Sequence, residues 1–432
     1  MRIAVIGSGI SGLMSAWLLS RKYAVTLFEA QDYLGGHTHT HRVEAHGRQY
    51  SVDSGFIVYN PRHYPLLTSL FEELGIESQP TTMSFSVRND RSGLQYNATD
   101  LNRLFCQRRN LLSPRFLGMV RDLLRFYRQA PAALQDETDQ SSVQEYLSEH
   151  RYGRAFIEDH LLPMACALWS CAPGNVLSFP VRHLLQFMAN HQMLQVAGRP
   201  MWYVVKGGSA EYVAALRARW RVEERVGQPV RSVRRNGSEV EIRTDDGRQH
   251  FDHVVLACHS DQALVLLTDA LGPEREVLGQ IRYQRNEVVL HTDTSVLPSR
   301  RSTWAAWNAL IPGDAAGCCV SYCMNLLQGF QSPEPFIVSL NAVEYIQPHR
   351  IIERMSYEHP VFSRAAVASQ KRKAEIQGKH RTWFAGAYWG WGFHEDGMRS
   401  AVEIANALGV QWPVAQLSPA GPSPQSYRER AA

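Results

Sequence analysis

The sequence of 432 residues lacks several features that would assign it to a specialised class of protein. It has no uninterrupted apolar run of about 20 residues, which excludes a membrane-spanning helix. Its charges nearly balance, with 45 Lys and Arg against 41 Asp and Glu, so the basic excess of a dedicated nucleic-acid-binding protein is missing. The first residues, MRIAVIGSGISG, lack the apolar core of a secretory signal peptide, and we therefore expect a cytoplasmic protein.

The seven cysteines also lack an organising pattern. Their number is odd, their spacing is irregular and no CxxC pair occurs, which favours reduced thiols over a disulfide framework or a zinc site. The alternating histidines of the string GGHTHTH have no further cluster of ligands beside them, so no metal site is predicted. What is present is 44% hydrophobic and 20% charged residues, a composition typical of a globular protein with a large core.

The chain begins with the pattern of a strand, a helix and a second strand. Residues 2–6 and 24–29 are short apolar runs typical of buried strands, and residues 11–21 have the apolar spacing of a helix. Residues 230–258 predict three more strands, at 230–234, 239–244 and 254–258, separated by Asn-Gly and Asp-Gly turn signals. A further helix is expected over 397–408.

A GxGxxG motif lies between the first strand and the first helix. Gly7 permits a tight turn, Gly9 lets the backbone approach a pyrophosphate, and Gly12 lets the helix pack closely on the sheet. Ser11 lies in the first turn of the helix, whose unpaired N–H groups would face the phosphates. Glu29 ends the second strand, where a carboxylate can accept hydrogen bonds from a ribose. Together these features predict a dinucleotide site.

Further segments, in the same order along the chain, resemble the flavin amine oxidoreductase and carotenoid desaturase superfamily. They are Gly35-Gly36-His37-Thr38, Val52-Asp53-Ser54-Gly55, Lys206-Gly207-Gly208, Val230, Val254-Val255-Leu256-Ala257-Cys258, and Phe384-Ala385-Gly386 followed by Gly397-Met398. The resemblance implies bound FAD, contacted along these segments by Gly36, His37, Thr38, Gly55, Val230, Gly386, Gly397 and Met398. It implies non-covalent attachment, because the cysteine that tethers the flavin in some members is not found.

The resemblance also implies the architecture. We expect an α/β protein with a Rossmann-like FAD domain of the glutathione-reductase type, and a discontinuous substrate domain of mixed sheet and helices. The FAD domain is assigned to residues 1–60, 201–280 and 370–411. The substrate domain is assigned to 61–200, with a helical subdomain, and 281–369. Residues 412–432, rich in Pro, Ser, Gln and Ala, are expected to be a disordered tail.

Three departures from the family pattern bear on the chemistry. The basic residue after the Gly-Gly pair is His37 where Arg is usual, and the acidic residue usual after Phe-Ala-Gly is Ala387, so Glu395 or Asp396 is expected to contact the ribityl chain. Asn286 stands where amine oxidases carry a lysine near the flavin. Counting back from the last Gly places His394 at an aromatic-cage position. Tyr388, Trp389 and Asn286 are therefore predicted to contact substrate.

These departures, with the string Gly-Phe-His-Glu-Asp-Gly, are similar to a bacterial group of FAD proteins that includes a desaturase of methyl-branched fatty acyl chains in furan fatty acid formation. The leading hypothesis is an FAD-dependent oxidoreductase that dehydrogenates such a lipid-like substrate, with His394 as base and Glu395 as the alternative. An amine or amino-acid oxidase that forms peroxide is one alternative. A flavin-dependent isomerase, or an accessory protein, is another.

Residues 114–128 predict a basic amphipathic helix. Phe116, Leu117, Val120, Leu123, Leu124 and Tyr127 share one face, and Arg121, Arg125 and Arg128 share the adjacent one. Such a helix can rest on an anionic lipid surface or receive a carboxylate headgroup, which would make the protein peripheral to the inner face of the membrane. It can equally pack on its own domain with the arginines in solvent. No nucleic-acid partner is expected.

Overall fold

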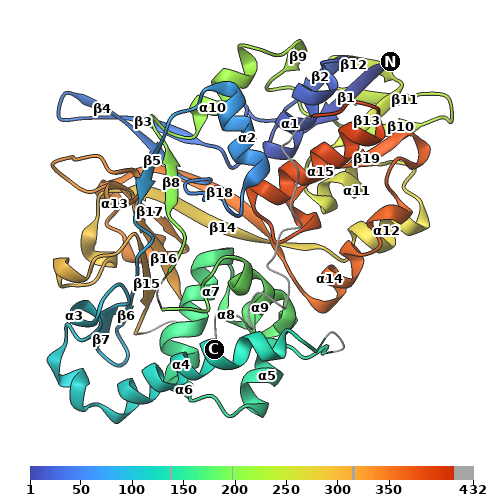
Figure 1. Cartoon of the computed structure of the whole chain (residues 1–432). Helices are drawn as coiled ribbons and strands as arrows, with labels where there is room; N and C mark the ends of the chain where they lie inside the picture. The colour runs from blue at the N-terminus through green and yellow to red at the C-terminus, as the bar shows by residue number, and fades with distance from the viewer. Residues whose placement is uncertain (137–138, 197, 314–316, 413–432) are drawn as a thin grey trace.

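The computed structural model describes residues 1–136, 139–196, 198–313 and 317–412. A five-stranded parallel sheet forms the core of the upper half in Figure 1. Its order is β19-β13-β1-β2-β9, with strands β1 (Arg2–Ile6), β2 (Ala24–Phe28), β9 (Val222–Arg225), β13 (His253–Leu256) and β19 (Thr382–Phe384). In β1, Ile3 and Val5 face one hydrophobic core while Ala4 and Ile6 face another. Burial on both faces explains why this strand is a continuous apolar run.

Helices cover one face of this sheet, and a small antiparallel sheet covers the other. The helices are α1 (Ile10–Leu19), α2 (Pro65–Leu74), α10 (Ala210–Arg217) and α15 (His394–Ala407). The other face packs on β10 (Ser232–Arg235), β11 (Val240–Thr244), β12 (Gly247–Phe251), α11 (Ser260–Leu266) and α12 (Gly272–Leu278). The parallel sheet flanked on both faces is the predicted Rossmann-like arrangement.

Residues 230–258 hold four strands where the sequence predicted three. The two turns are hairpins as expected, since β10 pairs with β11 and β11 with β12, both antiparallel. The missed strand is β12, whose residues Gly-Arg-Gln-His-Phe show no apolar alternation. The last strand, β13, leaves the small sheet and pairs with β1 in parallel.

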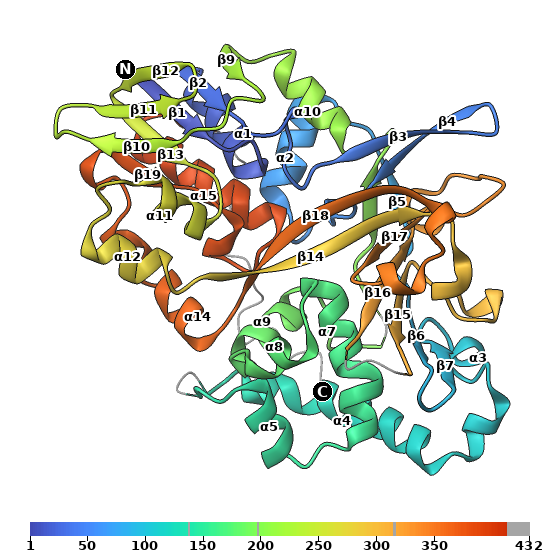
Figure 2. The same cartoon turned by 180° about the vertical axis from the view of Figure 1, so that it is seen from behind.

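A seven-stranded mixed sheet forms the second half, in the order β18-β14-β17-β16-β15-β6-β7. Its strands are β6 (Phe85–Asn89), β7 (Leu94–Asn97), β14 (Arg282–His291), β15 (Trp307–Ile311), β16 (Cys319–Cys323), β17 (Ile337–Leu340) and β18 (Ile351–Val361). Figure 2 shows β14 and β18 running side by side from this sheet to the nucleotide half. They are antiparallel over their length, so the two halves share one continuous pair of strands.

A helical layer packs beneath the seven-stranded sheet (Figure 1). It consists of α4 (Pro114–Ala133), α5 (Val143–Glu149), α6 (Arg154–Phe156), α7 (Leu162–Trp169), α8 (Pro173–Ser178) and α9 (Val181–Asn190). Shorter elements complete the fold: hairpins β3 (Thr40–Ala45) with β4 (Arg48–Asp53) and β5 (Ser78–Thr81) with β8 (Trp202–Val205), and helices α3 (Leu101–Leu104), α13 (Met324–Gln328) and α14 (Arg364–Gln370).

The α/β architecture of the two sheets agrees with the predicted fold class. Strands of the parallel sheet fall within 1–60, 201–280 and 370–411, and those of the mixed sheet within 61–200 and 281–369. The domain boundaries themselves stay a prediction. The predicted tail lies outside the described residues except for Trp412. That residue is buried against Trp17 and donates to a Glu73 carboxylate oxygen at 2.8 Å, so 412 belongs to the folded part.

The predicted apolar face of residues 114–128 is divided in the structure. α4 buries Phe116, Met119 and Phe126 against the helical layer, whereas Leu117 and Leu124 are 42% and 51% exposed. The apolar residues span about half of the helix circumference, and the sequence pattern does not show which part of that arc is packed. In the described part of the chain, no helix combines the length and apolarity needed to cross a membrane.

Candidate active site

A cavity of about 1200 Å³ extends from the parallel sheet into the second half of the molecule. At one end it is lined by the turn after β1, by Glu29 and by Val230. Its middle is lined by His37 and His394, and its far end by side chains of the helical layer and the seven-stranded sheet. An elongated cavity of this kind can hold a dinucleotide and a second molecule together.

The nucleotide end is built from glycines that cannot be replaced freely. Gly7 has φ +97°, and a Cβ there would lie 2.8 Å from the Ala257 carbonyl oxygen. A Cβ on Gly12 would lie 1.9 Å from the Gly7 carbonyl oxygen, so α1 can start this close to the turn only without a side chain. Gly9 lines the cavity and has no atom within 4 Å of its Cβ position. That open space beside a helix N-terminus suits a pyrophosphate.

Glu29 is held in place at the end of β2. One carboxylate oxygen accepts hydrogen bonds from the Ser8 amide (2.8 Å) and hydroxyl (2.6 Å), and the other accepts from the Gln31 amide at 2.9 Å. Glu29 and Val230 both line the cavity here. This fixed acceptor next to an apolar wall fits the ribose and adenine of a dinucleotide.

The N-terminus of α15 meets that of α1 at the middle of the cavity. α15 begins at His394, three residues before the predicted start, and a Cβ on Gly397 would lie 2.8 Å from Ile10 Cγ2 and Ser11 Oγ. Ile10, Ser11 and His394 line the cavity. Two helix N-termini therefore direct their positive dipole ends into one space, where they stabilise an anionic ligand.

The acidic pair after His394 has structural contacts. Both oxygens of Glu395 accept from the first turn of α2, from the Leu66 and Leu67 amides at 3.0 and 3.1 Å. Asp396 accepts from the Trp391 and Phe393 amides at 3.0 and 3.1 Å and so caps its own helix. Neither residue lines the cavity. Glu395 therefore caps α2 and does not face the cavity, where proton transfer was predicted for it. Asp396 caps α15 and does not reach the cavity, where a contact to the cofactor was predicted.

Other predicted residues also lie behind the cavity wall. Met398 is buried in the core next to α1, and Trp389 packs outside Tyr388, with its ring nitrogen donating to the Phe384 carbonyl. Tyr388 itself lines the cavity, as do Gly36, Gly55 and Gly386. Thr38 stands one layer back and contacts His394. The predicted set thus divides into residues that line the cavity and residues that support them.

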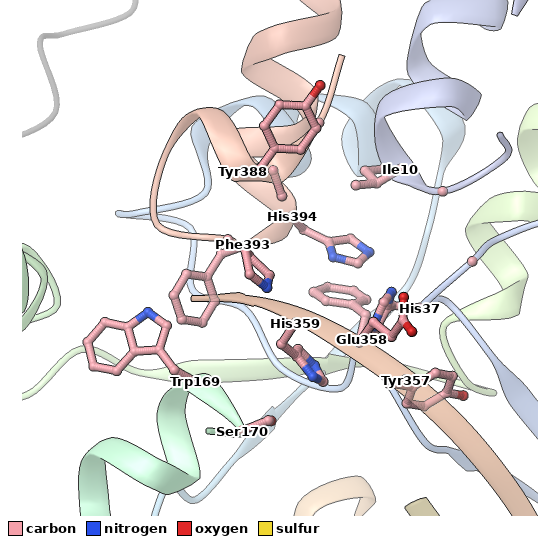
Figure 3. A pocket seen from close by; sticks show the side chains of 18 of the residues that line it. Ile10, His37, Trp169, Ser170, Tyr357, Glu358, His359, Tyr388, Phe393 and His394 are labelled. Atoms are coloured by element: carbon pink, nitrogen blue, oxygen red, sulfur yellow. The ribbon is translucent and has the colours of Figure 1, made fainter. Parts of the chain in front are cut away.

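Three histidines surround the middle of the cavity, as Figure 3 shows. The rings of His37 and His359 are 5.2 Å apart, and His37 is 4.9 Å from Tyr357. Burial lowers the pKa of His37, the pKa of His359 to about 4 and the pKa of His394 to about 3. All three are therefore neutral at pH 7. The Nε2 atom of His37 is buried without a hydrogen-bond partner, as expected of a group whose partner is a bound polar ring.

His394 is fixed on both sides. Its ring stacks on Phe56 at 3.8 Å, and Nε2 lies 3.1 Å from the Thr38 hydroxyl and 3.3 Å from the Tyr212 hydroxyl. Thr38 and Tyr212 also hydrogen-bond to each other. A neutral imidazole attached to two hydroxyl groups can pass a proton out of the cavity, but its low pKa makes it a weak base.

Asn286, predicted to contact substrate, does not line the cavity; it holds a residue that does. Its Nδ2 donates to His359 Nδ1 at 2.9 Å. The direction of this bond follows from the neighbouring amide. The Ala172 backbone N–H donates to Gln284 Oε1 at 3.1 Å, which leaves Gln284 Nε2 to donate to Asn286 Oδ1 at 3.2 Å.

A second chain of hydrogen bonds fixes the same orientation. The Glu287 backbone N–H donates to Asn341 Oδ1, and Asn341 Nδ2 donates to Asn286 Oδ1 at 2.8 Å. Asn286 therefore presents its amide hydrogens to His359, whose Nδ1 must accept. The ring proton lies on Nε2, the free end of a side chain that lines the cavity. Sequence reasoning missed His359, because a single His in a long strand carries no motif.

The far end of the cavity is apolar. It is lined by side chains such as Met83, Met164, Leu168, Trp169, Phe187 and Met193. The described lining residues from 81–202 and 307–322 include no carboxylate, and their only charged member is Arg199. The acidic lining residues are Glu29, Asp261 and Glu358; the last is paired with His259 at 3.3 Å. Met201, also in the lining, is 57% exposed, so this part of the cavity wall reaches the surface.

Comparison with known proteins agrees with this geometry. The family model for flavin-containing amine oxidoreductases matches residues 10–315. The chain belongs to this family. Members of the amine oxidoreductase family bind FAD, the cofactor that the sequence predicted. The amine oxidoreductase fold also explains the glycine turn, the Glu29 carboxylate and the converging helix N-termini, which fit the adenosine, ribose and diphosphate portions of FAD.

Individual relatives are distant. A putative flavin-containing monoamine oxidase, AofH, of Mycobacterium tuberculosis is 26% identical over 289 residues, which cover 64% of this chain and 61% of that protein. A 4,4'-diapolycopen-4-al dehydrogenase of Metabacillus indicus is 45% identical over 78 residues, 18% of this chain and 14% of that protein. The chain thus matches about three fifths of the first relative's length.

Solved structures show the same fold over nearly the whole chain. A putative protoporphyrinogen oxidase from Exiguobacterium superposes with a TM-score of 0.65 at 17% identity, covering 94% of this chain and 98% of that one. A fatty acid isomerase from P. acnes superposes with a TM-score of 0.66 at 16% identity, covering 95% and 99%. At these identities the likeness concerns the fold alone.

Proposed function

We propose that the enzyme dehydrogenates an elongated, lipid-like acyl chain that lies in the apolar end of the cavity. The observation that carries the proposal is the charge of that end: its described lining holds no carboxylate and one cation, Arg199. A methyl-branched acyl chain is the substrate that the sequence resemblance implies. The fold accepts fatty acids in at least one relative, since a solved structure is that of a fatty acid isomerase.

The apolar lining favours an acyl chain over an amine. An alkylammonium ion that leaves water needs a counter-charge or a strong acceptor. The methionine and aromatic side chains around Trp169 and Phe187 offer neither, but they suit methylene groups, each worth about 0.8 kcal/mol on burial. Arg199 at the exposed end can pair with a carboxylate or phosphate at the end of such a chain.

The residues of the chain have distinct parts in this reaction. When bound, FAD would supply the hydride-accepting chemistry. Phe393 and Trp169 line the cavity near His394 and exclude water from the reacting carbons (Figure 3). His394 stays the predicted acceptor of the accompanying proton, with the Thr38 and Tyr212 hydroxyls as its exit. The Nε2–H of His359 is a donor for the cofactor or for a substrate carbonyl.

We further propose that FAD is held without a covalent bond.

An amine oxidase is the second candidate. It is favoured by the aromatic side chains beside the histidines, which include Phe393, Tyr357 and Trp169, because aromatic faces can attract a cation. It would leave the long apolar end of the cavity without a role. A flavin-dependent isomerase would use the same acyl site but return the electrons to its product.

Anaerobic titration of the purified, yellow protein tests the proposal. Detergent-dispersed branched and unbranched fatty acyl substrates should bleach the oxidised-flavin absorbance, and the bleaching should persist until oxygen is admitted. A small aliphatic amine should bleach it far more slowly. Rapid bleaching by the amine alone would contradict the proposal, and acyl conversion with the flavin oxidised throughout would indicate an isomerase.

His394→Ala should slow reduction by about a hundredfold or more while FAD stays bound. His183→Phe is the matched control, because His183 is buried in the helical layer and does not line the cavity. An unchanged reduction rate in His394→Ala would remove this residue from the mechanism and leave the substrate assignment intact.

A further inference from the structure

We propose that one face of α4 and the turn before it dock on the surface of an anionic lipid bilayer, from which the substrate enters the cavity. The proposal rests on the acyl substrate proposed above. The surface is called the basic ridge and consists of Leu111, Leu112, Leu117, Arg121, Leu124 and Arg128. In both views of the molecule it belongs to the segment along the lower edge, opposite the parallel sheet (Figures 1 and 2).

The leucines of the basic ridge are unusually exposed. Leu112 is 87%, Leu124 51%, Leu111 49% and Leu117 42% exposed. Single exposed apolar residues are common and need no explanation, but neighbours on one face indicate an interaction surface. Leu101, 75% exposed, begins the same segment in α3. Five of the large exposed apolar side chains of the described chain thus occur within 24 consecutive residues.

Helix geometry places the two kinds of side chain together. At 100° per residue, Leu117, Arg121, Leu124 and Arg128 fall within an arc of about 60° on α4. The packed residues Met119 and Phe126 lie on the opposite side, and the packed Phe116 lies on the flank between the two faces. The ridge therefore alternates leucine and arginine along one line, and the helix has a separate face for the protein core. A helix used only for packing has no need of that leucine row.

The charge of the segment is opposite in sign to that of a bacterial inner leaflet. Residues 101–128 contain seven arginines and one acidic residue, Asp122, whereas the whole chain has a net charge of only +4. Asp122 is buried and contacts Arg121 and Arg125 at 3.4 and 3.6 Å. Each arginine near an anionic bilayer contributes about 1 kcal/mol to binding. Leucines inserted among lipid headgroups add the apolar contribution.

The basic ridge adjoins an exposed part of the cavity wall. Arg199 lines the cavity and its guanidinium lies 3.4 Å from the hydroxyl of Tyr127, on the flank of α4. Met201, which is exposed and also lines the cavity, follows in the same loop, and Val196 before it is 71% exposed. A chain leaving the bilayer beside α4 would therefore meet an apolar entrance, with a cation for its anionic end.

Vesicle co-sedimentation of the holoenzyme tests the proposal. The protein should bind vesicles that contain phosphatidylglycerol, bind those of phosphatidylcholine weakly, and be released by high salt. Arg121→Glu with Arg128→Glu, and separately Leu117→Ser with Leu124→Ser, should each lower the partition coefficient by about tenfold or more. Arg243→Glu and Leu326→Ser change exposed residues elsewhere and should leave it unchanged.

Each other outcome has a definite meaning. Equal binding to both vesicles, or no binding, overturns the proposal. If the arginine-to-glutamate variants lose vesicle binding and the leucine-to-serine variants do not, the surface would bind a polyanion such as RNA, and the proposal would be overturned. A dimer in sedimentation velocity that dissociates in Leu117→Ser with Leu124→Ser would assign the ridge to a second copy and overturn it as well. Retained flavin absorbance and an unchanged unfolding midpoint show that the variants are folded.

The test separates this proposal from the proposed function. Reduction of the flavin by detergent-dispersed acyl substrate needs no bilayer, so ridge variants should reduce at the wild-type rate there and more slowly with substrate in anionic vesicles. If acyl substrates fail in detergent while vesicle binding is intact, the substrate assignment is wrong. If they succeed in detergent while vesicle binding is absent, the docking surface is wrong.

Discussion

The two ends of the cavity are built in different ways. The nucleotide end consists mainly of backbone, namely a glycine turn and two helix N-termini. Its one fixed carboxylate is held by backbone and hydroxyl donors. The apolar end consists of side chains from the helical layer, the seven-stranded sheet and the loop at 193–202. Backbone geometry restricts which residues are allowed, whereas a side-chain wall tolerates many combinations. The cofactor end is therefore rigidly specified, and the substrate end is where relatives can differ.

Substitutions in the glycine turn should have the largest effect. Gly12→Ala places a methyl group against the Gly7 carbonyl, so we expect loss of folded, yellow protein. Gly9→Ala has space within the protein and a φ of −60°, so it should fold but bind FAD at least about tenfold more weakly, or 1.4 kcal/mol. Circular dichroism and flavin absorbance separate the two results.

Gly118→Ala is the matched control for the glycine series. It lies in α4, has no atom within 4 Å of its Cβ position and does not line the cavity. It should keep FAD and gain about 0.5–1 kcal/mol in the free energy of unfolding. Normal FAD binding by Gly9→Ala would mean that the turn does not contact the diphosphate, and the contrast between the two ends would fail.

The two halves should also respond differently to pH. Burial lowers the pKa of His183 in α9 to about 3. Between pH 6.5 and 3 the unfolded chain protonates this His while the native state does not, so stability is lost as pH falls. Burial raises the pKa of Asp53 to about 6 and that of Glu395 to about 7. Their contribution is present below about pH 4 and is lost as pH rises toward 7.

Hydrogen exchange of the holoenzyme at pH 5 and 7, corrected for intrinsic rates, measures this difference. The helical layer around His183 should lose more protection at pH 5 than the region around Asp53 and Glu395, because the lowered pKa values of His41 and His394 there offset the raised pKa values of the two acids. His183→Phe should remove about 2 kcal/mol of the acid sensitivity between pH 7 and 5. An equal loss of protection in both regions, unaffected by the substitution, would show that these groups do not set the pH response.

Substitutions of Asn286 test the middle of the cavity, between its two ends, where Asn286 holds His359. Asn286→Asp replaces a donor by a carboxylate, which should move the His359 proton to Nδ1 and raise the His359 pKa from about 4. Flavin reduction at pH 7 should fall about tenfold and acquire a new pH dependence. Because Asn286 acts as a positioning residue, Asn286→Leu should slow reduction without that new dependence. Identical pH profiles for the two variants would exclude a role for the ring tautomer.

Arg199 should have the smallest effect and the most selective one. Arg199→Glu is expected to raise KM for an anionic acyl substrate by about fivefold, the size of an exposed ion pair, with little change in kcat. A neutral methyl ester of the same chain should be affected less, and it serves as the control substrate. An equal rise in KM for the acid and the ester would mean that Arg199 packs against the substrate and forms no ion pair with its carboxylate.

The same contrast decides how much the sequence could predict. The GxGxxG turn and Glu29 were found because close backbone approach requires glycine at fixed spacing. Glu395 and Asp396 lie away from the cavity, because α15 starts at His394 and directs them toward α2 and toward its own N-terminal cap. His359 was missed, since its place in the site depends on the register of β18 against β14 and on the amide of Asn286. The apolar end gathers residues far apart in the chain, which no local pattern records.

The carboxylate of Glu395 has a consequence for assembly. Glu395 directly follows His394, which lines the cavity, and its carboxylate accepts hydrogen bonds from the start of α2, the first helix of the segment that leads to the helical layer. Binding of the prosthetic group beside α15 would therefore also order the point at which this segment leaves the nucleotide half. Cofactor binding and ordering of the start of α2 would then be coupled, and a preparation stripped of its flavin would be cleaved by proteases near residue 60.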